Sequence, residues 1–340
     1  MIPVFKPSIK RKEMDALLST LVSDYQEAAN DNNDFLKALA KYLQFEPGAI
    51  VREYSTAIYI ALKALGLGPG SKVLVSALSP SSYIKEFEKL SITAVYADVE
   101  ISTGCIRAEE VQRLAESGID GVVLCSPNGI TPDYSLFSEL AVPVISDITT
   151  TVGCSTGDED SGWLPDIVIL RMELMDIITS GEGTAVFAGN RKILPELRSV
   201  IADLPVTSLL LNMHAAMGLI QLDSLENFIE RRREIGDIFE KSLLKGNHKS
   251  FFQTNELTRN YPSFYVVLNS PFKEIIRYAR KNGIMVELAF TDTALAIEPD
   301  LSEQCPNANS LHMRTAVFPL YPGLGSRNTL AIARLLSTLP

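Results

Sequence analysis

Three charged residues that lie close together in the sequence are the first candidates for chemistry. Arg171 lies near the end of the largely apolar run 167–172, which is typical of a buried strand, and Glu173 and Asp176 follow it. Two carboxylates in one pocket push their pKa values apart, so that one can act as an acid and the other as a base. The same residues could instead form an ion-paired cluster that only fills space. The spacing leaves both interpretations open.

Asp147 is a second candidate, at the end of the apolar run 143–148. Open α/β sheets bind ligands beyond the carboxyl ends of their strands, so Asp147 could meet a ring nitrogen or a cationic ligand there. Alternatively, its carboxylate could cap the following turn through Thr149 or Thr150. Both hypotheses are kept.

Metal and disulfide chemistry are not indicated. Cys105, Cys125, Cys154 and Cys305 are scattered without a C-x-x-C pair, and the three histidines lie at no metal-like spacing. The acidic run 158–160 could be imagined as a calcium site, but a solvated acidic loop is the simpler interpretation. We therefore expect buried reduced thiols and no metal.

Composition limits the class of protein. The 340 residues include 31 basic and 41 acidic ones, giving a net charge of −10, which argues against nucleic acid or anionic lipid as a partner. No apolar stretch approaches a membrane span, and the basic run 10–12 precedes no apolar signal core. We expect a cytoplasmic protein. The second basic run, 231–233, is predicted to be the exposed face of a helix.

The hydrophobic pattern of the sequence predicts the strands and helices that could position these residues. Short β-branched runs alternate with helical stretches at 57–65, 81–90 and 108–117, which indicates a mainly parallel sheet with crossover helices. The runs are nearly continuously apolar, as strands buried on both faces are. There are seven of them: 49–54, 72–78, 93–99, 121–125, 143–148, 167–172 and 184–188.

The second half of the chain predicts a smaller unit. Apolar residues at helical spacing indicate one long helix over 212–244. Beyond it, strand and helix patterns alternate in a small α+β arrangement, with strands at 263–269, 284–288 and 315–320 and helices at 271–282 and 327–337. We expect a large domain over 1–240 and a small C-terminal domain over 241–340.

Several short segments, spread over almost the whole chain, form a familiar series. They are Ser55-Thr56-Ala57 leading into 61–70 (ALKALGLGPG), 97–99 (ADV), 146–147 (SD), 179–183 (TSGEG), 215–222 (AAMGLIQL) and 319–324 (PLYPGL). In this order they resemble the DegT/StrS family of nucleotide-sugar aminotransferases.

The resemblance implies a fold and an activity. The fold would be a three-layer αβα, PLP-transferase-like α/β structure with a seven-stranded, mainly parallel sheet and a small C-terminal α+β domain. Family members use pyridoxal phosphate (PLP) to transaminate keto-sugars and form homodimers with active sites at the subunit interface. PLP chemistry requires a lysine amine for the Schiff base, an acid at the pyridine nitrogen and groups that bind phosphate.

The lysine is missing from the position where the resemblance places it. That position lies five residues before the glycine that opens Gly181-Glu182-Gly183, and here it is Asp176. No lysine occurs between Lys89 and Lys192, so a local shift of alignment restores none. A carboxylate cannot form an aldimine, and the sugar dehydratases of the family, which carry histidine there, are not matched either.

Other cofactor positions also depart from the pattern. Only Thr56, in the phosphate loop, and Asp147, at the pyridine nitrogen, match. His214 lies where the family usually has a polar residue, and a solvated or interface histidine is a simpler interpretation than a base. The departures are Ser55 for the phosphate-loop glycine, Pro80 for the stacking aromatic, Thr150 for Gln or His, Arg171 for the phosphate-binding serine, and Thr207 and Leu209 for Asn and Arg.

We therefore expect a degenerate family member that lacks PLP-lysine transaminase chemistry and needs no cofactor. It would act as a nucleotide-sugar-binding or regulatory partner in polysaccharide or secondary-metabolite biosynthesis, as a homodimer or as a heterodimer with an active paralogue. Two alternatives keep it an enzyme: PLP held non-covalently by Thr56 and Asp147 in a dehydratase-like reaction, or another reaction run by Asp176, Glu173 and Arg171. Overall similarity alone would favour a third, an ordinary PLP-dependent aminotransferase.

Overall fold

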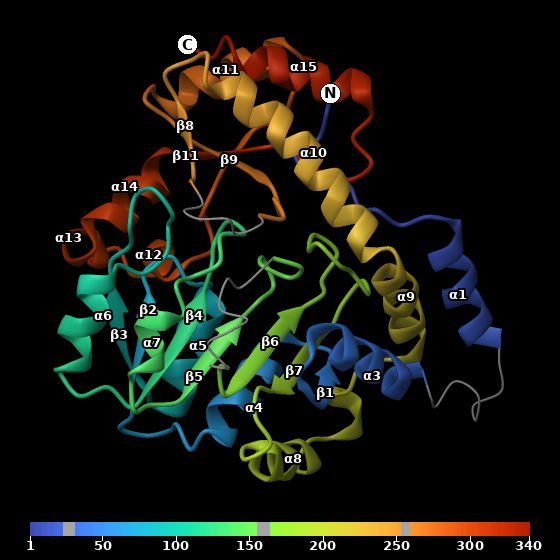
Figure 1. The fold of residues 1–340 in the computed structure, drawn as a ribbon, viewed down its shortest axis with the longest axis vertical. Helices are drawn as coiled ribbons and strands as arrows, with labels where there is room; N and C mark the ends of the chain where they lie inside the picture. Colours follow the sequence, from blue (N-terminus) through green and yellow to red (C-terminus); the bar gives the residue numbers. More distant parts are fainter. Residues whose placement is uncertain (23–30, 155–163, 253–258) are drawn as a thin grey trace.

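The computed structural model describes residues 1–22, 31–154, 164–252 and 259–340. Two sheets organise this part of the chain (Figure 1). The larger has seven strands in the order β1-β7-β6-β5-β4-β2-β3, and the smaller has four in the order β10-β11-β9-β8. The large-sheet strands are β1 (Glu46–Val51), β2 (Lys72–Ser76), β3 (Thr93–Ala97), β4 (Gly121–Cys125), β5 (Val144–Asp147), β6 (Ile167–Arg171) and β7 (Thr184–Ala188).

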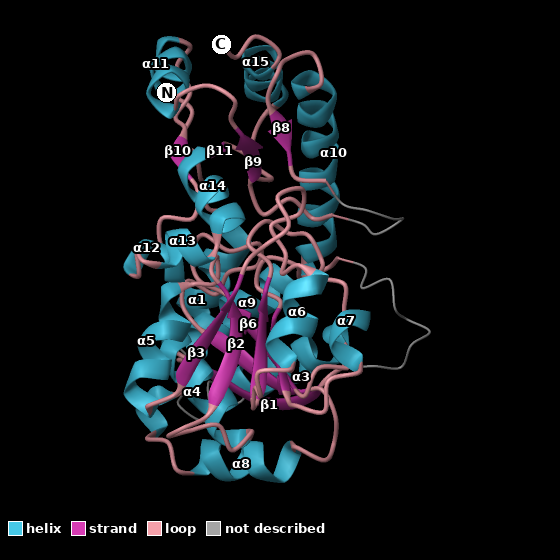
Figure 2. Ribbon diagram, turned by 90° about the vertical axis from the view of Figure 1, so that its left-hand side faces the viewer, coloured by secondary structure: helices cyan, strands magenta, loops and turns pink. Residues whose placement is uncertain are grey.

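Alternating apolar side chains bury the large sheet on both faces, as predicted. In β2, Val73 and Val75 join the core under α4 and α5, whereas Leu74 joins the core under α6 and α7. Helices therefore cover both faces in three layers (Figure 2). The helices of this region are α1 (Arg11–Val22), α3 (Asp31–Leu43), α4 (Tyr54–Ala64), α5 (Ser81–Leu90), α6 (Ala108–Ala115), α7 (Ser135–Ser138) and α8 (Leu194–Ala202).

Strand direction brings the candidate residues to one edge. The strands β3, β2, β4, β5 and β6 pair in parallel, and only β7 runs against its neighbours β6 and β1. Since β1 is antiparallel to β7, it runs in the same direction as β5 and β6. The carboxyl ends of β1, β5 and β6 therefore meet at the same edge, where α/β sheets place their ligands.

The predicted single long helix is wrong. The structure has α9 (Asn212–Asp223) and α10 (Leu225–Leu243), which change direction at Ser224 (Figure 1). The amide of Ser224 bonds to the carbonyls of Gln221 and Leu222, and its ψ of −3° departs from the helical value, so the regular helix is interrupted at this residue. A short 3₁₀ turn, η1 (Val206–Ser208), precedes α9.

The smaller sheet packs beside the C-terminal half of α10 (Figure 1). Its strands are β8 (Lys249–Ser250), which the sequence pattern did not predict, β9 (Phe264–Val267), β10 (Glu287–Leu288) and β11 (Thr315–Phe318). The domain boundary expected at residue 240 falls inside α10 and stays a prediction. The remaining helices are α11 (Phe272–Lys281), α12 (Ala294–Ile297), α13 (Leu301–Gln304), α14 (Pro306–Arg314) and α15 (Ser326–Leu336).

The expectation that residues 231–233 form an exposed helical face is also wrong. Arg232 is fully buried, and its Nη1 donates to the carbonyl oxygens of Tyr261, Pro262 and Leu320 at 2.9–3.2 Å. Burial lowers the pKa of Arg232 to about 10. The guanidinium therefore joins α10 to the smaller sheet from inside the core. None of the described helices combines the length and the apolar character that crossing a membrane requires.

Candidate functional site

Asp147, at the carboxyl end of β5, is the centre of a buried polar cluster. Its Oδ2 accepts hydrogen bonds from the hydroxyls of Tyr54 and Tyr83, the latter at 3.0 Å. Its Oδ1 accepts the backbone N–H of Thr149 at 3.0 Å, which is the turn-capping bond considered from the sequence. Only 7% of Asp147 is exposed, and both oxygens are engaged by the chain itself.

The two tyrosines come from neighbouring helices. Tyr54 is the first residue of α4, directly after the carboxyl end of β1, and Tyr83 lies in the first turn of α5. Their rings meet edge to face with centroids 5.8 Å apart. Burial, together with the negative charge of Asp147, raises the pKa of both phenols well above the ordinary value. Both are therefore neutral donors to a carboxylate.

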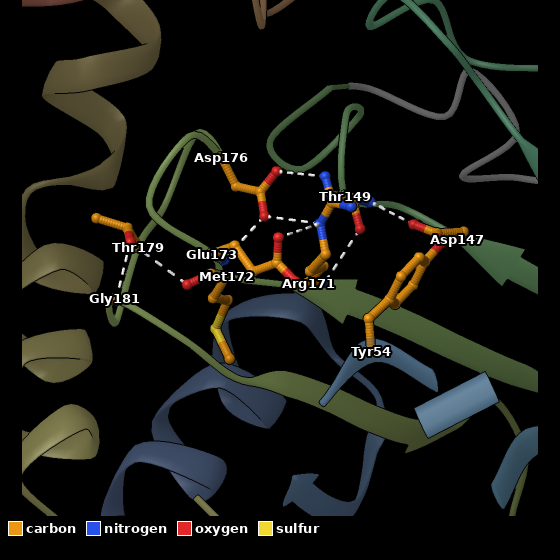
Figure 3. A network of polar contacts seen from close by, with 9 residues as sticks. All are labelled: Tyr54, Asp147, Thr149, Arg171, Met172, Glu173, Asp176, Thr179 and Gly181. Atoms are coloured by element: carbon orange, nitrogen blue, oxygen red, sulfur yellow. Dashed lines mark hydrogen bonds and ion pairs between the residues drawn. The ribbon is translucent and has the colours of Figure 1, made fainter. Parts of the chain in front are cut away.

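Arg171 and Asp176 form the second half of the cluster (Figure 3). The guanidinium donates in two parallel bonds, Nε to Oδ2 and Nη2 to Oδ1, each 3.0 Å long. The backbone N–H of Glu173 donates to the same Oδ2 at 2.8 Å. The side chain of Asp176 is 8% exposed and that of Arg171 29%. Burial by itself would lower the pKa of Arg171, but Asp176 holds it above its usual value, so the guanidinium is protonated at neutral pH and donates charge-assisted bonds.

Glu173 contributes less than its sequence position suggested. Its Oε2 lies 3.8 Å from the Nε of Arg171, and 49% of its side chain is exposed. Burial raises the pKa of Asp176, while the Arg171 guanidinium acts in the opposite direction. The two carboxylates therefore occupy different environments, with one buried in a bidentate pair and the other at the surface. This geometry favours the ion-paired interpretation of the cluster.

Arg171 joins the two halves. Its guanidinium carbon lies 5.1 Å from the centroid of the Tyr54 ring, which places a cation over the ring face. Its backbone N–H donates to the hydroxyl of Thr149 at 3.0 Å. One continuous set of contacts thus leads from Asp147 through Tyr54 and Arg171 to Asp176, across the carboxyl ends of β5, β1 and β6 (Figure 3).

The other predicted cofactor contacts lie around this cluster. Ser55 and Thr56 follow Tyr54 in the first turn of α4, and the Ser55 hydroxyl is 3.5 Å from a carboxylate oxygen of Glu53. Pro80 precedes α5 and forms an isolated bridge with Thr293. The hydroxyl of Thr150 donates to the carbonyl of Ser126. Each position lies at the expected edge of the sheet, and its role in binding a cofactor stays a prediction.

The residues before and within α9 lie apart from this cluster. The Nδ1 of His214 is 2.8 Å from the carbonyl oxygen of Ser180, and its Nε2 is 3.9 Å from Glu182. Thr207 belongs to the 3₁₀ turn, and Leu209 bridges to Val51. The structure therefore does not bring His214 into contact with Asp147, Arg171 or Asp176.

These side chains do not fit a PLP held as the resemblance implies. Asp176 carries no amine, and within the described part of the chain no lysine bonds to Asp147, Arg171 or Asp176. The carboxylate expected at the pyridine nitrogen already accepts two phenols, and an arginine stands where a serine would bind phosphate. Of the two positions that match the family pattern, Asp147 and Thr56, the carboxylate of Asp147 is already engaged by the chain itself.

Sequence reasoning missed Tyr54 and Tyr83. The signal for Tyr54 was its place directly before Ser55-Thr56, in the loop that the resemblance assigns to phosphate. A large aromatic side chain there has to point somewhere near the bound group. Tyr83 carried no comparable signal, because an aromatic residue on an apolar helix face is usually part of the core.

Other candidate sites give little support for chemistry. In the described ranges no cluster of three or more potential metal ligands occurs. The acidic run 158–160 lies outside the described residues. A cavity of about 710 Å³ opens between α10 and residues 248–252, and none of the predicted site residues lines it. Its wall includes Glu240, Arg259 and Tyr261.

The chain is similar to known proteins over almost its whole length. The model of the DegT/DnrJ/EryC1/StrS aminotransferase family matches residues 7–336. GDP-perosamine synthase of Vibrio cholerae is 23% identical over 95% of this chain and 95% of its own.

Two solved structures are similar over nearly their whole lengths. Spr1654 of Streptococcus pneumoniae in its PLP form has a TM-score of 0.87 at 17% identity, covering 99% of this chain and 97% of its own. A point mutant of GDP-4-keto-6-deoxymannose-3-dehydratase, solved with bound GDP-perosamine, has a TM-score of 0.83 at 16% identity, covering 99% and 100%. The expected PLP-transferase-like α/β fold is thereby confirmed. With the family model matching almost the entire sequence, the chain belongs to the DegT/DnrJ/EryC1/StrS aminotransferase family.

Proposed function

We propose that this member of the sugar aminotransferase family does not carry out PLP-lysine transamination. It binds a nucleotide sugar or regulates an active paralogue, in the biosynthesis of a polysaccharide or secondary metabolite in the cytoplasm. The observation that carries the proposal is the bidentate pair between Arg171 and Asp176, the residue at which the resemblance expects the Schiff-base lysine. A buried guanidinium–carboxylate pair supplies neither a nucleophilic amine nor a free base.

The nucleotide-sugar part of the proposal comes from the relatives. One curated relative is named for GDP-perosamine, and a structural neighbour was solved with GDP-perosamine bound. Because this chain covers nearly the full length of both proteins, we propose that it has counterparts of their sugar-binding regions. The catalytic lysine position and the sugar site are separate features, so the loss of one leaves the other available.

The partner is proposed to be a second subunit, either identical or an active paralogue. Exposed apolar side chains near the β6–β7 connection and before α9 support this. Val206 is 82% exposed and Met175 62%, with Leu174 and Leu211 also in contact with solvent. Large apolar side chains that gather at a surface commonly mark a protein interface.

The experiment combines PLP trapping with product analysis. The full chain is mixed with PLP, reduced with borohydride and digested, and the peptides are examined by mass spectrometry. The GDP-perosamine synthase of Vibrio cholerae serves as the positive control. We expect no stoichiometric pyridoxyl-lysine in this chain and no amino sugar from glutamate and a nucleotide-4-keto-6-deoxy sugar. A stoichiometric adduct together with product formation would overturn the proposal.

Ligand and subunit composition need separate measurements. Calorimetric titration with GDP-mannose, UDP-N-acetylglucosamine and dTDP-glucose tests the sugar site, and saturable binding of at least one is expected. Analytical ultracentrifugation tests self-association: a homodimer would have twice the chain mass of 37.3 kDa. A monomer that binds none of the three nucleotide sugars would contradict the first role and leave only the mixed dimer to be sought.

A second candidate is an enzyme that holds PLP without a Schiff base. The absence of a lysine at position 176 favours it over an ordinary aminotransferase, and a sugar 3-dehydratase is among the structural neighbours, at a TM-score of 0.83. In this case Asp147 and Thr56 would bind the cofactor. Stoichiometric PLP binding that borohydride does not convert to an adduct would support this candidate against the first.

A further inference from the structure

Tyr54 connects the two places at which the resemblance would anchor PLP. It is the first residue of α4, and Ser55 and Thr56, the phosphate-loop positions, follow it in the same turn. Helix N-termini bind phosphate through their free N–H groups, so the loop is suited to that end of the cofactor. The hydroxyl of Tyr54 bonds to Asp147, the position for the pyridine nitrogen. One side chain therefore spans from the phosphate end to the ring-nitrogen end.

The Tyr54 ring is held on several sides. The Arg171 guanidinium lies over one face at 5.1 Å, and the Tyr83 ring meets it edge to face at 5.8 Å. Its hydroxyl is fixed on Asp147 (Figure 3), and only 7% of the residue is exposed. The pyridine ring of a bound PLP would likewise be a planar aromatic ring whose polar end contacts this carboxylate.

The neighbouring departures from the family pattern keep the ring in place. Arg171 reaches the ring because Asp176 fixes its guanidinium with two bonds of 3.0 Å. Without Asp176, Arg171 would be a partly buried charge that lacks its main partner. Asp176 and Arg171, at the expected positions of the lysine and the phosphate-binding serine, thus hold the Tyr54 ring in place together.

From these contacts we infer that Tyr54 occupies the volume that the pyridine ring of PLP would need, so that the chain excludes the cofactor with its own side chain. This inference deepens the proposed function and rests on its assignment of the cofactor positions. It adds that the site is closed sterically as well as lacking an amine. Removal of the ring is then expected to open a space bounded by Asp147, Arg171 and the first turn of α4.

The test uses 4-deoxypyridoxine 5′-phosphate, an analogue without an aldehyde, because it cannot form Schiff bases with surface lysines. Wild type, Tyr54→Ser, Tyr54→Asn and the matched control Tyr54→Phe are compared by equilibrium dialysis and calorimetry. Tyr54→Phe keeps the ring and loses only the hydroxyl. We expect no saturable binding by wild type or Tyr54→Phe, and at least tenfold tighter binding, at one analogue per chain, by Tyr54→Ser or Tyr54→Asn.

Stoichiometric binding of the analogue by wild type overturns the inference, as does equally weak binding by folded Ser and Asn variants. Should both variants fail to fold, 3-fluorotyrosine placed at position 54 of the wild-type chain gives an independent measurement. Its ¹⁹F resonance is expected to be unchanged by excess analogue, and a saturable shift refutes the exclusion. Analogue binding by wild type without any borohydride-trapped PLP would refute this inference and support the second candidate, an enzyme that holds PLP without a Schiff base, whereas a trapped pyridoxyl-lysine together with product formation would refute the proposed function itself.

Discussion

Replacing Asp176 with asparagine tests the ion pair at the lysine position. The change keeps the size of the side chain and removes its charge. It breaks the bidentate pairing with Arg171 and weakens the acceptor of the Glu173 amide, at 3.0, 3.0 and 2.8 Å. Removing one partner of a fully buried pair costs about 3–5 kcal/mol. Because Arg171 is 29% exposed and Glu173 stays near it, we expect the free energy of unfolding to fall by about 2–3 kcal/mol.

The assay is urea and thermal unfolding followed by circular dichroism. For a protein of this size, such a loss lowers Tm by about 3–4 °C. Glu173→Gln is the control, because its carboxylate is half exposed and 3.8 Å from Arg171, and it should cost less than about 0.5 kcal/mol. A double-mutant cycle with Arg171→Gln isolates the pair, with a coupling of about 1 kcal/mol or more expected. If Asp176→Asn and Glu173→Gln are equally mild, the buried pair does not exist as described.

Three further predictions concern other parts of the molecule. Tyr83→Phe should cost about 1.5–3 kcal/mol at neutral pH, since a bond to a charged acceptor is lost. Burial raises the Tyr83 pKa, so the folding stability of wild type should fall above pH 10 by about 1.4 kcal/mol per pH unit for this residue. Chemical unfolding from pH 8 to 11 should therefore show the free energies of unfolding of wild type and Tyr83→Phe approaching each other. A difference that stays constant with pH would contradict this. Arg232→Met leaves three buried carbonyls without their donor and should cost about 3 kcal/mol in thermal unfolding, with Arg231→Met as the milder control. Gly218→Ala places a Cβ 2.3 Å from the Phe35 ring and should lower the free energy of unfolding in urea by about 1–3 kcal/mol. The control Gly68→Ala, with open space around the new Cβ, should be nearly neutral. Equal effects of the two changes would refute the close packing of α3 on α9.

The large sheet could be predicted because its strands carry the continuous apolar pattern of burial on both faces. Val73, Leu74 and Val75 form such a run, and the structure sends alternate members to opposite layers. The break at Ser224 could not be predicted, since the apolar spacing continues across it and one serine is compatible with a helix. Arg232 was misjudged for a similar reason: local sequence gives no sign of the three carbonyls that converge on it from distant segments.

The candidate site was predictable in part. The end of an apolar strand predicted Asp147 at the carboxyl edge of the sheet, and the spacing allowed Arg171 to pair with Asp176, which the structure shows in two bonds of 3.0 Å. The choice between Asp176 and Glu173 as the main partner depends on how the 172–183 connection folds, which the short run of sequence does not determine. The link from Tyr54 to Asp147 joins residues 93 positions apart, and no local pattern encodes it.

The shared contacts of Tyr54, Arg171 and Asp176 have a consequence for anyone who wishes to engineer an active transaminase from this chain. Lysine introduced alone at position 176 would put an ammonium group beside a guanidinium, and serine introduced alone at 171 would strand the buried carboxylate. Trimming Tyr54 alone would leave a void beneath the cation. Each of these single exchanges is therefore expected to destabilise the site, and the exchanges at 171 and 176 have to be made together. The shared contacts therefore oppose a stepwise return to the family's residues.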